Sequence, residues 1–450
     1  MTYSIKSDEA IVRIKKILNS KTCVNCGTCV ALDENNDSRM VDTEWGPIPE
    51  FGPNSKLPYN IEDYCPGYGI NYPYLYQKHF AKYPKNWLIG NFEKIGIGYS
   101  YHEDIRINSA SGGILSEVLI YLLEGKYIDG AIIANQGTPT AEKARATIAR
   151  TKEDILQSAQ SVYIPVSMLD ILPKLNLDET YAITTLPEQT SALRKMQIEG
   201  NKFSKTIKYV LGPYTGTALY PSAIKYFLKS RRIKKGDEIK SLKWRAGEWP
   251  GYLEIITNSG ATIKSPKVYY NFLIPFFITR TSLQSMDFTN EFTDLSVGDA
   301  WSPKFEKQGK GFSVVLCRSV EMLSIIEEMV KKKIITFEEI NEKDAIDMHG
   351  HMIDFKKRGG YLRNQIRKRL GKIVPDYGYK PISITFSRKI VEVVIVCIFG
   401  LASTKLARWI LSLIPEKIIG PVFNFLRLGW KDVSKPTKRK NLLEYEVLIK

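Results

Sequence analysis

Apolar positions follow a helical spacing at the start of the chain and lose any period soon afterwards. Residues 1–20 place Ile11 and Ile14 on one face of a short amphipathic helix. Residues 21–73 are irregular and are punctuated by Gly and Pro, as in "EWGPIPEFGPNSKLP". Such a stretch is typical of a backbone that bound ligands hold in place, so residues 1–87 predict a small N-terminal unit without a large core.

From about residue 88 the pattern changes to short apolar runs separated by loops and helices. "IGIGYS" indicates a strand, "SASGGILSEVLIYLLEGK" a Gly-rich loop that leads into a helix, and "IDGAIIANQ" a buried strand. That order is typical of an α/β unit with a parallel sheet. Further strands are predicted at "YAITTLP", "IKYVLGPY", "LEIITNSGATIKS" and "DLSVGDAW", the third with a hairpin turn at residues 258–260. Residues 88–345 are therefore expected to form one mixed α/β domain.

A helix is predicted at residues 151–160. Thr151 is a good N-cap residue, and acidic side chains in the first turn complement the positive end of the helix dipole.

The last part of the chain, residues 346–450, is first basic and then apolar. Residues 355–372 predict a basic helix, and residues 390–426 are the most apolar stretch of the chain. The longest run there without Lys or Arg is 390–404, which is shorter than the roughly 20 residues that a membrane-spanning helix needs.

Two interpretations of this apolar stretch remain open. Lys405, Arg408 and Lys417 are interleaved with Trp409 and Phe423, as in interfacial helices that lie beside an acidic leaflet. The other interpretation is a pair of amphipathic helices packed on the body of the protein. The first predicts a peripheral protein on the inner membrane face, and both are consistent with a cytoplasmic chain.

The formal charge of +16, from 64 basic and 48 acidic residues, predicts an anionic partner such as a nucleotide, a phosphorylated substrate or an acidic lipid surface. No helix-turn-helix, zinc-finger or aromatic RNA-binding signature accompanies the charge, which argues against nucleic acid. The start, "MTYSIKSDEAIVRIKK", has no apolar run like that of a signal peptide, so a cytoplasmic location is expected.

Four of the six cysteines have the spacing of a metal site rather than of a disulfide framework. Cys23, Cys26 and Cys29 form a C-x2-C-x2-C run, and Cys65 in "YCPG" supplies a fourth thiolate followed by proline. Such a set is typical of a 4Fe-4S cluster. Zinc or no metal is the alternative, although three ligands so close in sequence crowd a tetrahedral ion.

Several blocks occur along the chain in a characteristic order: "CVNCGTCV…VDTEWGPIPEF…YCPG", "IRINSASGGILSEVLIYLLEGKYIDGAII", "TLPEQTSALRK", "YVLGPYTGT", "KWRAGEWPGYLEI", "DLSVGDAWSP" and "FKKRG". Together they resemble the coenzyme F420 hydrogenase/dehydrogenase beta-subunit family over roughly residues 20–370. The resemblance implies a ferredoxin-like 4Fe-4S segment (1–87), a flavin-binding α/β domain (88–345) and an amphipathic helical region (346–450). Members pass electrons between iron–sulfur clusters, a bound FAD and an organic acceptor, and relatives also occur among polysaccharide biosynthesis proteins.

The resemblance implies a cofactor-binding loop at Ser109, Ser111, Gly112 and Gly113, directly before a helix. Adjacent glycines let a backbone approach a cofactor, and the free N–H groups of a helix start suit the diphosphate of FAD or the carbonyl edge of the flavin. Without its context, an ordinary loop with a capping serine explains the same residues.

Two further blocks are candidate walls of the same site. Lys243 and Arg245, close to Trp249, combine charge with a stacking surface that suits an anionic cofactor or substrate. Asp299 and Trp301 offer a carboxylate and an aromatic face at the end of a strand. A solvated basic hairpin and an ordinary turn closed by a core Trp are the respective alternatives.

The chain departs from the family at a second set of cysteines, which many relatives carry and which are held to bind another cluster. Glu188, Thr215, Ser282 and Ser285 stand at those positions, and these side chains ligate iron poorly beside thiolates. The second cluster is therefore expected to be lost. Glu188 becomes a candidate catalytic acid or base if burial raises its pKa, whereas a surface glutamate is the simpler interpretation.

Two pairs of residues are expected to carry no chemistry. His349 and His351 in "DMHGHM" have no obvious further ligand beside them, so they predict a solvated turn. Cys317 and Cys397 lie in apolar stretches and are expected to be buried as small hydrophobic residues.

Three functions are compatible with these features. The first is an oxidoreductase that passes electrons from an external donor, such as ferredoxin or a partner subunit, through one 4Fe-4S cluster and FAD to an organic acceptor, for example a nucleotide- or lipid-linked sugar. The second is an electron-transfer subunit that reduces or oxidises coenzyme F420 or a partner protein. The third is a non-redox structural descendant in polysaccharide biosynthesis.

Overall fold

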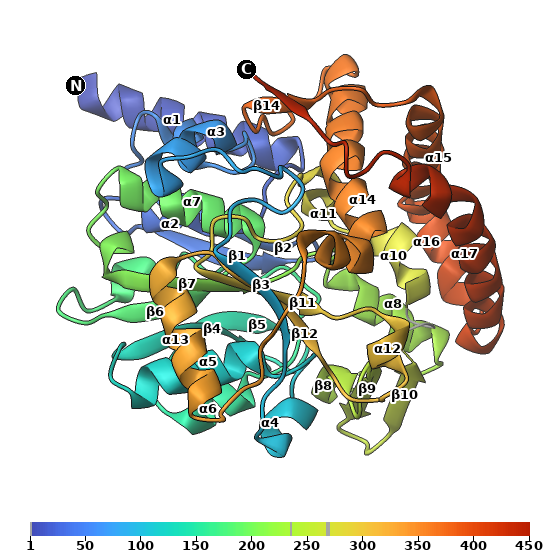
Figure 1. Cartoon of the computed structure of the whole chain (residues 1–450). Helices are drawn as coiled ribbons and strands as arrows, with labels where there is room; N and C mark the ends of the chain where they lie inside the picture. The colour runs from blue at the N-terminus through green and yellow to red at the C-terminus, as the bar shows by residue number, and fades with distance from the viewer. Residues whose placement is uncertain (1, 235, 267–270) are drawn as a thin grey trace.

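One large sheet organises the chain, for which a computed structural model describes residues 2–234, 236–266 and 271–450 (Figure 1). Its strands are β3 (Lys94–Gly98), β4 (Gly130–Gln136), β5 (Ala144–Ala149), β6 (Tyr181–Thr184), β7 (Ile207–Pro213), β11 (Leu295–Asp299), β12 (Ser313–Cys317) and β13 (Glu338–Glu339). They follow one another across the sheet in the order β13-β3-β12-β11-β7-β6-β4-β5. The predicted mixed α/β fold is confirmed.

The central strands β11, β7, β6 and β4 are parallel, whereas β12 is antiparallel to both β11 and β3. β3 therefore runs in the same direction as the four parallel strands. The predicted strand-loop-helix-strand unit is present, but four other strands lie between β3 and β4 in the sheet. The carboxyl ends of five strands consequently meet at one edge, which is where α/β sheets bind their ligands.

Helices cover both faces of the sheet. α5 (Ile114–Glu124), α6 (Lys152–Gln157) and α13 (Val320–Lys331) pack on one face through a core that includes Val118, Ile155 and Ile326. α7 (Pro187–Ile198) and the first half of α14 (Glu342–Arg369) cover the other face. Thr151 caps α6 as expected, since its hydroxyl accepts a hydrogen bond from Asp154 N at 3.2 Å.

The N-terminal unit contains α1 (Thr2–Asn19), as predicted, and the short helix α2 (Thr28–Ala31). The expectation of irregular backbone throughout 21–73 is wrong in one place, because β1 (Ser38–Thr43) and β2 (Gly46–Phe51) form an antiparallel hairpin. The side chains of β1 are exposed or only partly buried, so its sequence shows no apolar alternation. This unit is not separate from the large sheet, since Cys26 and Ala31 belong to the core beneath α7.

A second, antiparallel sheet contains β8 (Ile239–Ala246), β9 (Tyr252–Thr257) and β10 (Thr262–Pro266) and packs against α8 (Ser222–Ser230). The predicted hairpin turn between β9 and β10 is confirmed, with Gly260 at φ 87°. Short helices complete the domain: α3 (Tyr72–Leu75), α4 (Glu103–Ile107), α10 (Ile274–Phe277), α11 (Arg280–Gln284) and α12 (Pro303–Glu306).

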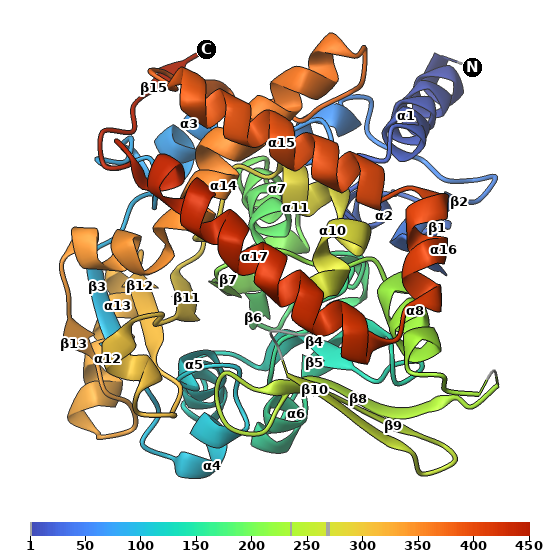
Figure 2. The same ribbon diagram turned by 90° about the vertical axis from the view of Figure 1, so that its right-hand side faces the viewer.

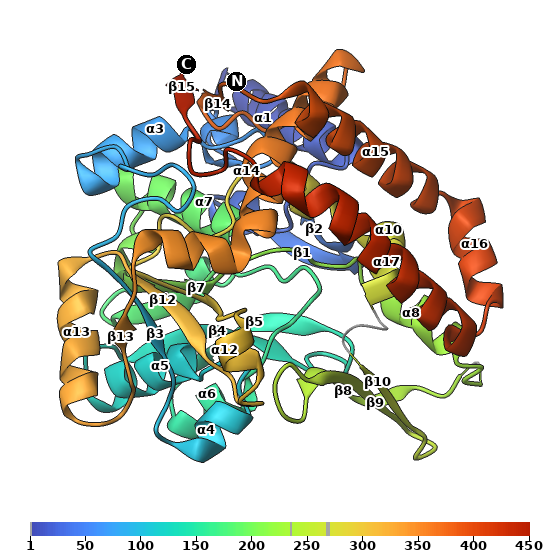
Figure 3. The same ribbon diagram turned by 45° about the vertical axis from the view of Figure 1, so that its right-hand side comes forward.

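The C-terminal region forms a layer of three helices, α15 (Phe386–Ala402), α16 (Lys405–Leu413) and α17 (Glu416–Arg439). They lie together on one side of the molecule, which Figure 2 turns toward the viewer and Figure 3 shows obliquely. After them, β15 (Val447–Ile449) returns to pair with β14 (Tyr379–Pro381). Cys317 is buried as expected, but Cys397 on α15 is exposed, so the expectation of a buried Cys397 is wrong.

No single helix in the described part of the chain is long and apolar enough to cross a bilayer. Among the helices of the described residues, only α15 and α16 together reach the necessary length and composition, and they are bent by 70° where they meet.

Candidate functional site

A cavity of about 2320 Å³ lies at the carboxyl ends of the parallel strands. Residues within two positions of five strand ends line it, namely Ile97, Ala134, Thr185, Tyr214 and Asp299. Side chains from α14, α15 and α17 close the opposite wall. Pockets for one ligand usually measure about 300–1,000 Å³, so this cavity has room for a cofactor and a second molecule together.

The Ser-Gly-Gly loop forms the wall of the cavity where α5 begins. Ser109, Ser111 and Gly113 all line the cavity, as do the first residues of the helix. Gly113 is the N-cap residue and has a φ of 84°, a conformation that costs glycine little. The amino end of α5 therefore faces the cavity and offers unpaired first-turn N–H groups to an anionic group.

Gly112 holds this loop against the sheet and does not line the cavity. Its N–H donates to Ser313 Oγ at 3.0 Å, and its carbonyl accepts a hydrogen bond from Ser100 N at 2.7 Å. A Cβ at this position would lie 2.5 Å from the carbonyl oxygen of Gly98 on β3. The close approach that requires glycine is thus between loop and strand, not between loop and cofactor.

Arg245 and Asp299 form a buried ion pair in the cavity wall, with 2.9 Å between Nη1 and Oδ2. Burial alone would lower the pKa of Arg245, but the neighbouring carboxylate outweighs it and holds that pKa above its ordinary value. The rings of Trp249 and Trp301 lie 4.7 Å apart beside this pair. Lys243 is exposed and does not line the cavity, so the structure brings together Arg245, Asp299 and Trp301 but not Lys243.

The four cysteines of the N-terminal unit line one small cavity together. Cys23 and Cys26 lie in the loop before α2, Cys29 lies within α2, and Cys65 follows a 3-10 turn at Ile61–Tyr64. All four are free thiols. Apolar side chains from α1 and the β1–β2 hairpin surround them.

This environment disfavours isolated thiolates. Burial, and after it the nearby Cys26, raises the pKa of Cys23 to about 12. Burial raises the pKa of Cys65 in the same way, followed by the effects of Cys26 and Cys23. A bound metal supplies the positive charge that deprotonates such thiols.

The donor set fits an iron–sulfur cluster. In the described residues no group of three or more His, Cys, Asp or Glu side chains is placed to hold one metal ion. The four cysteines surround one shared cavity, and four soft thiolates are the ligands that iron–sulfur clusters use.

One short segment, residues 164–169, separates the cysteine site from the large cavity. Leu169 N donates to Cys26 O at 3.0 Å, and Val166 and Met168 pack with Cys26 in one core. Val166 and Met168 also line the large cavity. We call residues 164–169 the wall segment, since they are hydrogen-bonded to the cysteine loop and also supply lining residues of the large cavity.

Three of the four positions of the lost cysteines, Glu188, Ser282 and Ser285, belong to one buried polar cluster around Lys356. Glu188 on α7 is only 4% exposed, so the interpretation as a surface glutamate is wrong. Ser285 lies beside its carboxylate, and Lys356 of α14 supplies an opposite charge. Lys356 Nζ also donates to Ser282 O at 3.0 Å. Thr215 differs from the other three, because it lines the large cavity.

Burial governs the ionisation of this cluster. It raises the pKa of Glu188, an effect that Lys356 opposes, and it lowers the pKa of Lys356 to about 8, which Glu188 opposes in turn. Glu188 is not among the residues that line the large cavity, although its neighbour Gln189 is. Its geometry therefore gives no support to the catalytic role considered for it.

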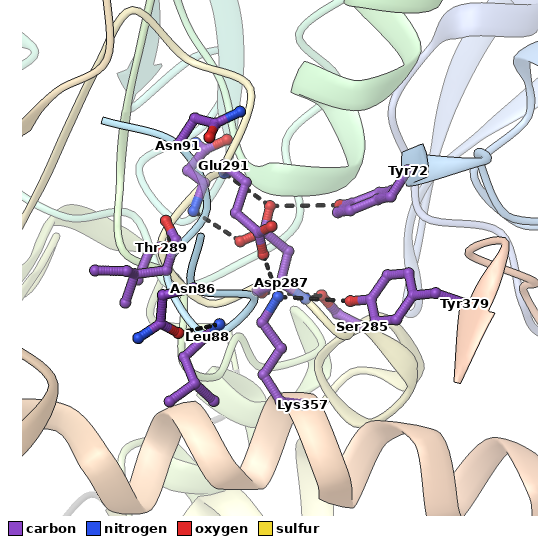
Figure 4. A network of polar contacts seen from close by, with 12 residues as sticks. Tyr72, Asn86, Leu88, Asn91, Ser285, Asp287, Thr289, Glu291, Lys357 and Tyr379 are labelled. Atoms are coloured by element: carbon purple, nitrogen blue, oxygen red, sulfur yellow. Dashed lines mark hydrogen bonds and ion pairs between the residues drawn. The ribbon is translucent and has the colours of Figure 1, made fainter. Parts of the chain in front are cut away.

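A second buried network continues from this cluster (Figure 4). Lys357 pairs with Glu291, and both side chains are fully buried. The hydroxyl of Tyr72 donates to Asp287 Oδ2 at 3.4 Å, and Asp287 N in turn donates to Ser285 Oγ at 3.3 Å. Burial raises the pKa of Glu291 to about 7 against the effect of Lys357.

The expectation of a solvated turn at His349 and His351 is wrong. Both side chains belong to α14 and line the cavity. Burial lowers the pKa of His349 to about 4 and that of His351 to about 3. Both imidazoles are consequently neutral at physiological pH.

Sequence reasoning missed four cations on the inner face of α17, Arg427, Lys431, Lys435 and Lys438, all of which line the cavity. The first three are spaced four residues apart, which places them on one helix face. This four-residue spacing could have identified the basic face from the sequence. It was overlooked because the apolar residues of the same helix dominate the pattern of this region.

The fold and these sites define an α/β protein with a large sheet-edge cavity beside a cysteine site. Models of the two halves of one family match the chain: the coenzyme F420 hydrogenase/dehydrogenase beta subunit N-terminus at residues 97–173 and its C-terminus at 178–343. The chain belongs to this family. The matched ranges include neither the four cysteines nor α15–α17.

Two curated relatives and one solved structure are similar to the chain. The coenzyme F420-dependent sulfite reductase of Methanocaldococcus jannaschii is 25% identical over 349 residues, 73% of this chain and 49% of that protein, so the chain spans about half the length of that relative. The coenzyme F420 hydrogenase subunit beta of Methanococcus voltae is 23% identical over 291 residues, 64% of this chain and 99% of that protein.

The solved structure is a xenon derivative of the F420-reducing [NiFe] hydrogenase complex from Methanosarcina barkeri. One of its chains has a TM-score of 0.50 and 18% identity, covering 63% of this chain and 95% of that chain. This similarity supports the same fold.

Proposed function

We propose that the protein is an iron–sulfur flavoprotein oxidoreductase that passes electrons from an external donor to an organic acceptor. Cys23, Cys26, Cys29 and Cys65 would hold one 4Fe-4S cluster, and the large cavity would hold FAD together with the acceptor. The observation that carries this proposal is the wall segment. Leu169 N donates to Cys26 O, and Val166 and Met168 of the same segment belong to the core that contains Cys26 and also line the large cavity.

The groups bound at these sites would supply one-electron transfer at the cluster and conversion between one- and two-electron steps at the flavin. The chain's own residues bind and orient them. The cysteines supply thiolates in an apolar shell, and the amino end of α5 orients an anionic group with its free N–H groups. Arg245, kept charged by Asp299, adds a fixed positive charge to the cavity wall.

The source of electrons and the acceptor are also part of the proposal. The named relatives are F420-linked, and one similar structure is a hydrogenase complex, which favours coenzyme F420 or a partner subunit as the electron partner. The volume of the cavity favours an acceptor bound beside the flavin, such as a nucleotide- or lipid-linked sugar. The alternative is an electron-transfer subunit without a metabolite of its own.

Anaerobic purification with measurement of iron, acid-labile sulfide and flavin tests the proposal. We expect four iron atoms and one flavin per chain. The Cys65→Ala variant should lose its iron and keep its flavin, whereas Cys317→Ala, a change of a buried cysteine in β12, should keep both. A colourless, zinc-containing protein would refute the proposal. A second test adds reduced coenzyme F420 and then a candidate sugar substrate to the protein. Reoxidation of the reduced flavin by the sugar substrate would identify an enzyme, whereas reduction by coenzyme F420 without such reoxidation would identify an electron-transfer subunit.

A further inference from the structure

The three C-terminal helices bury charged side chains and expose apolar ones. On α15, Arg388 and Glu392 are fully buried, whereas Phe386 is 76% and Leu401 72% exposed. This is the reverse of an ordinary surface helix, whose apolar stripe faces the core.

The same reversal continues along α16 and α17. Arg408 is buried on α16, while Trp409 on the same helix is 54% exposed. The outer face of α17 exposes the apolar side chains of Ile418 and Val422, and exposed apolar residues continue along the same helix face with Phe425, Leu426 and Val433, which also line the cavity. The three helices lie on the side of the molecule that Figure 2 turns toward the viewer, and each of them carries exposed apolar residues. Exposed apolar surface of this extent is typical of a docking surface.

The charge around this surface favours a lipid bilayer over a protein partner. Residues 386–440 carry eleven Lys and Arg against three Asp and Glu. Lys389, Lys405 and Lys417 are exposed on the same helices as the apolar residues. Basic residues beside Trp and aliphatic side chains are the composition of helices that lie in the interface of an anionic membrane. The 70° bend between α15 and α16 suits helices that lie along a surface.

We infer that α15, α16 and α17 seat the protein on an anionic lipid bilayer, with their exposed apolar residues in the interface. The opposite sides of these helices remain packed on the body of the protein, since Arg388 on α15 is bound to Asp354 of α14 at 2.8 Å.

Co-sedimentation of the purified full chain with vesicles tests this inference. Leu401→Ser, Trp409→Ser and Ile418→Ser change one side chain on each helix, with exposures of 72%, 54% and 59%, and none of the three lines the cavity. We expect binding to vesicles of phosphatidylcholine with phosphatidylglycerol, and roughly a tenfold or greater loss of binding in the triple variant.

The matched control changes three exposed apolar residues on other elements, Val12→Ser, Leu177→Ser and Val320→Ser. It should bind vesicles as the unaltered protein does. Absence of binding by the unaltered protein, or equal loss in both triple variants, would overturn the inference. The inference would also be overturned if the unaltered protein were a dimer and the helix-layer triple variant, but not the control, were a monomer. A second copy of the chain would then cover this face.

A different observation points to a binding site inside the cavity, on the opposite side of α17. Arg427, Lys431, Lys435 and Lys438 line the cavity from one helix face. In the residues that the structure describes, none of the four takes part in an ion pair. Arg427 Nε is buried without a hydrogen-bond partner, as is Nδ1 of the neighbouring His351.

The cations destabilise one another in this position. Burial lowers the pKa of Lys438 to about 8, with Glu392 and Asp354 opposing the effect. Burial also lowers the pKa of Lys431, and Arg427 and Lys435 lower it further, while Glu306 opposes them. A row of unpaired, partly desolvated cations is stabilised by a multivalent anion, and phosphate groups are the common ligands of this kind.

We propose that this basic row binds the phosphate or diphosphate group of the molecule that shares the cavity. The proposal rests on the proposed function only in taking that molecule to be the acceptor. A phosphate carried by a nucleotide and one carried by a lipid offer the same chemistry. If the phosphate belongs to a lipid, the apolar chain of that lipid would extend toward the membrane surface on the other side of α17.

Titration of Trp430 fluorescence tests the site, because Trp430 lines the cavity on the same helix. Inorganic pyrophosphate, uridine diphosphate-glucose and geranylgeranyl diphosphate serve as probes. The Lys431→Gln/Lys435→Gln variant should weaken binding of pyrophosphate roughly tenfold or more, and the exposed-surface control Lys405→Gln/Lys417→Gln should not. If geranylgeranyl diphosphate binds more tightly than pyrophosphate, the phosphate group belongs to a lipid. If uridine diphosphate-glucose binds more tightly than pyrophosphate, it belongs to a nucleotide.

No binding of any probe at millimolar concentration, or equal binding by both double variants, would overturn the basic row as a phosphate site. Binding does not need iron or electron transfer. Its failure is therefore distinguishable from a failure of the proposed redox function, which the iron and flavin contents report.

Discussion

Arg388 of α15 donates from Nε to Oδ2 of Asp354 on α14 at 2.8 Å, and both side chains are fully buried. Asp354 also pairs with Arg358 at 2.5 Å, while Arg388 reaches Glu392 at 2.7 Å. The chain thus fastens its C-terminal layer to the body through buried charges. A buried pair is costly to break, because removing one partner leaves the other uncompensated.

Replacing Arg388 should therefore destabilise the protein strongly. We expect Arg388→Ala to lower the free energy of unfolding by about 3–5 kcal/mol, measured by urea denaturation. Lys389→Ala, next along α15 but exposed, should change it by less than about 0.5 kcal/mol. Similar effects of the two substitutions would show that the ion pairs do not hold the helix layer.

Gly112→Ala should disturb the cofactor loop. The added methyl group would meet Gly98 O at 2.5 Å, so the loop must move away from β3. We expect a loss of stability of about 1–3 kcal/mol and a lower flavin content after purification. Gly400→Ala on the exposed side of α15 meets no atom within 4 Å, does not line the cavity and should stabilise its helix by about 0.5–1 kcal/mol. Unchanged stability and flavin content in Gly112→Ala would contradict this role.

Asp33 should confer a pH-dependent stability on the loop that joins the first three cysteines to Cys65. Its carboxylate accepts hydrogen bonds from Lys56 N at 2.6 Å and from Ser38 Oγ at 2.7 Å. Burial opposes ionisation, but these and other hydrogen bonds hold the pKa of Asp33 below its ordinary value. Because the folded-state pKa is lowered, the stabilisation is present above the unfolded pKa of about 3.9 and is lost as the pH falls through the folded value.

The Asp33→Asn variant measures this effect. At pH 7 it should be less stable by about 1–3 kcal/mol in urea unfolding, since hydrogen bonds to a charged group are lost. The difference from the unaltered protein should shrink as the pH falls below about 4. A difference that is constant with pH would mean that the charge of Asp33 contributes nothing.

Glu188 and Lys356 should behave as a structural pair. Glu188→Gln leaves a buried Lys356 with less compensation, and we expect a loss of about 3 kcal/mol or more of stability. The double variant Glu188→Gln/Lys356→Met should recover a large part of it. The rate of flavin reduction per bound flavin should be unchanged in the double variant. A rate that falls while stability recovers would restore a chemical role to Glu188.

The elements that the sequence predicted well are those with a strong local signal. Thr151 with acidic residues in the next turn identified the start of α6, and apolar runs identified β3, β4, β7 and β11. The β1–β2 hairpin was missed because neither of its faces is fully buried, so its residues do not alternate.

The candidate site was less predictable because its contacts are long-range. Glu188 and Lys356 are far apart in the sequence, and no local pattern indicates that the fold brings them together as a buried pair. The wall segment has no motif at all. Its role depends on the packing of Val166 and Met168 against Cys26, which only the folded chain brings about.

The width of α17 determines the distance between the cavity and the outer surface of the helix layer. One helix, about 10–12 Å across, separates the basic row in the cavity from Ile418 and Val422 on the outer face. A molecule anchored in a bilayer would need to extend its head group by only that distance to reach the cavity. Removing the C-terminal helices would open one wall of the reaction chamber as well as detach the protein, so attachment and chemistry share a single structural part.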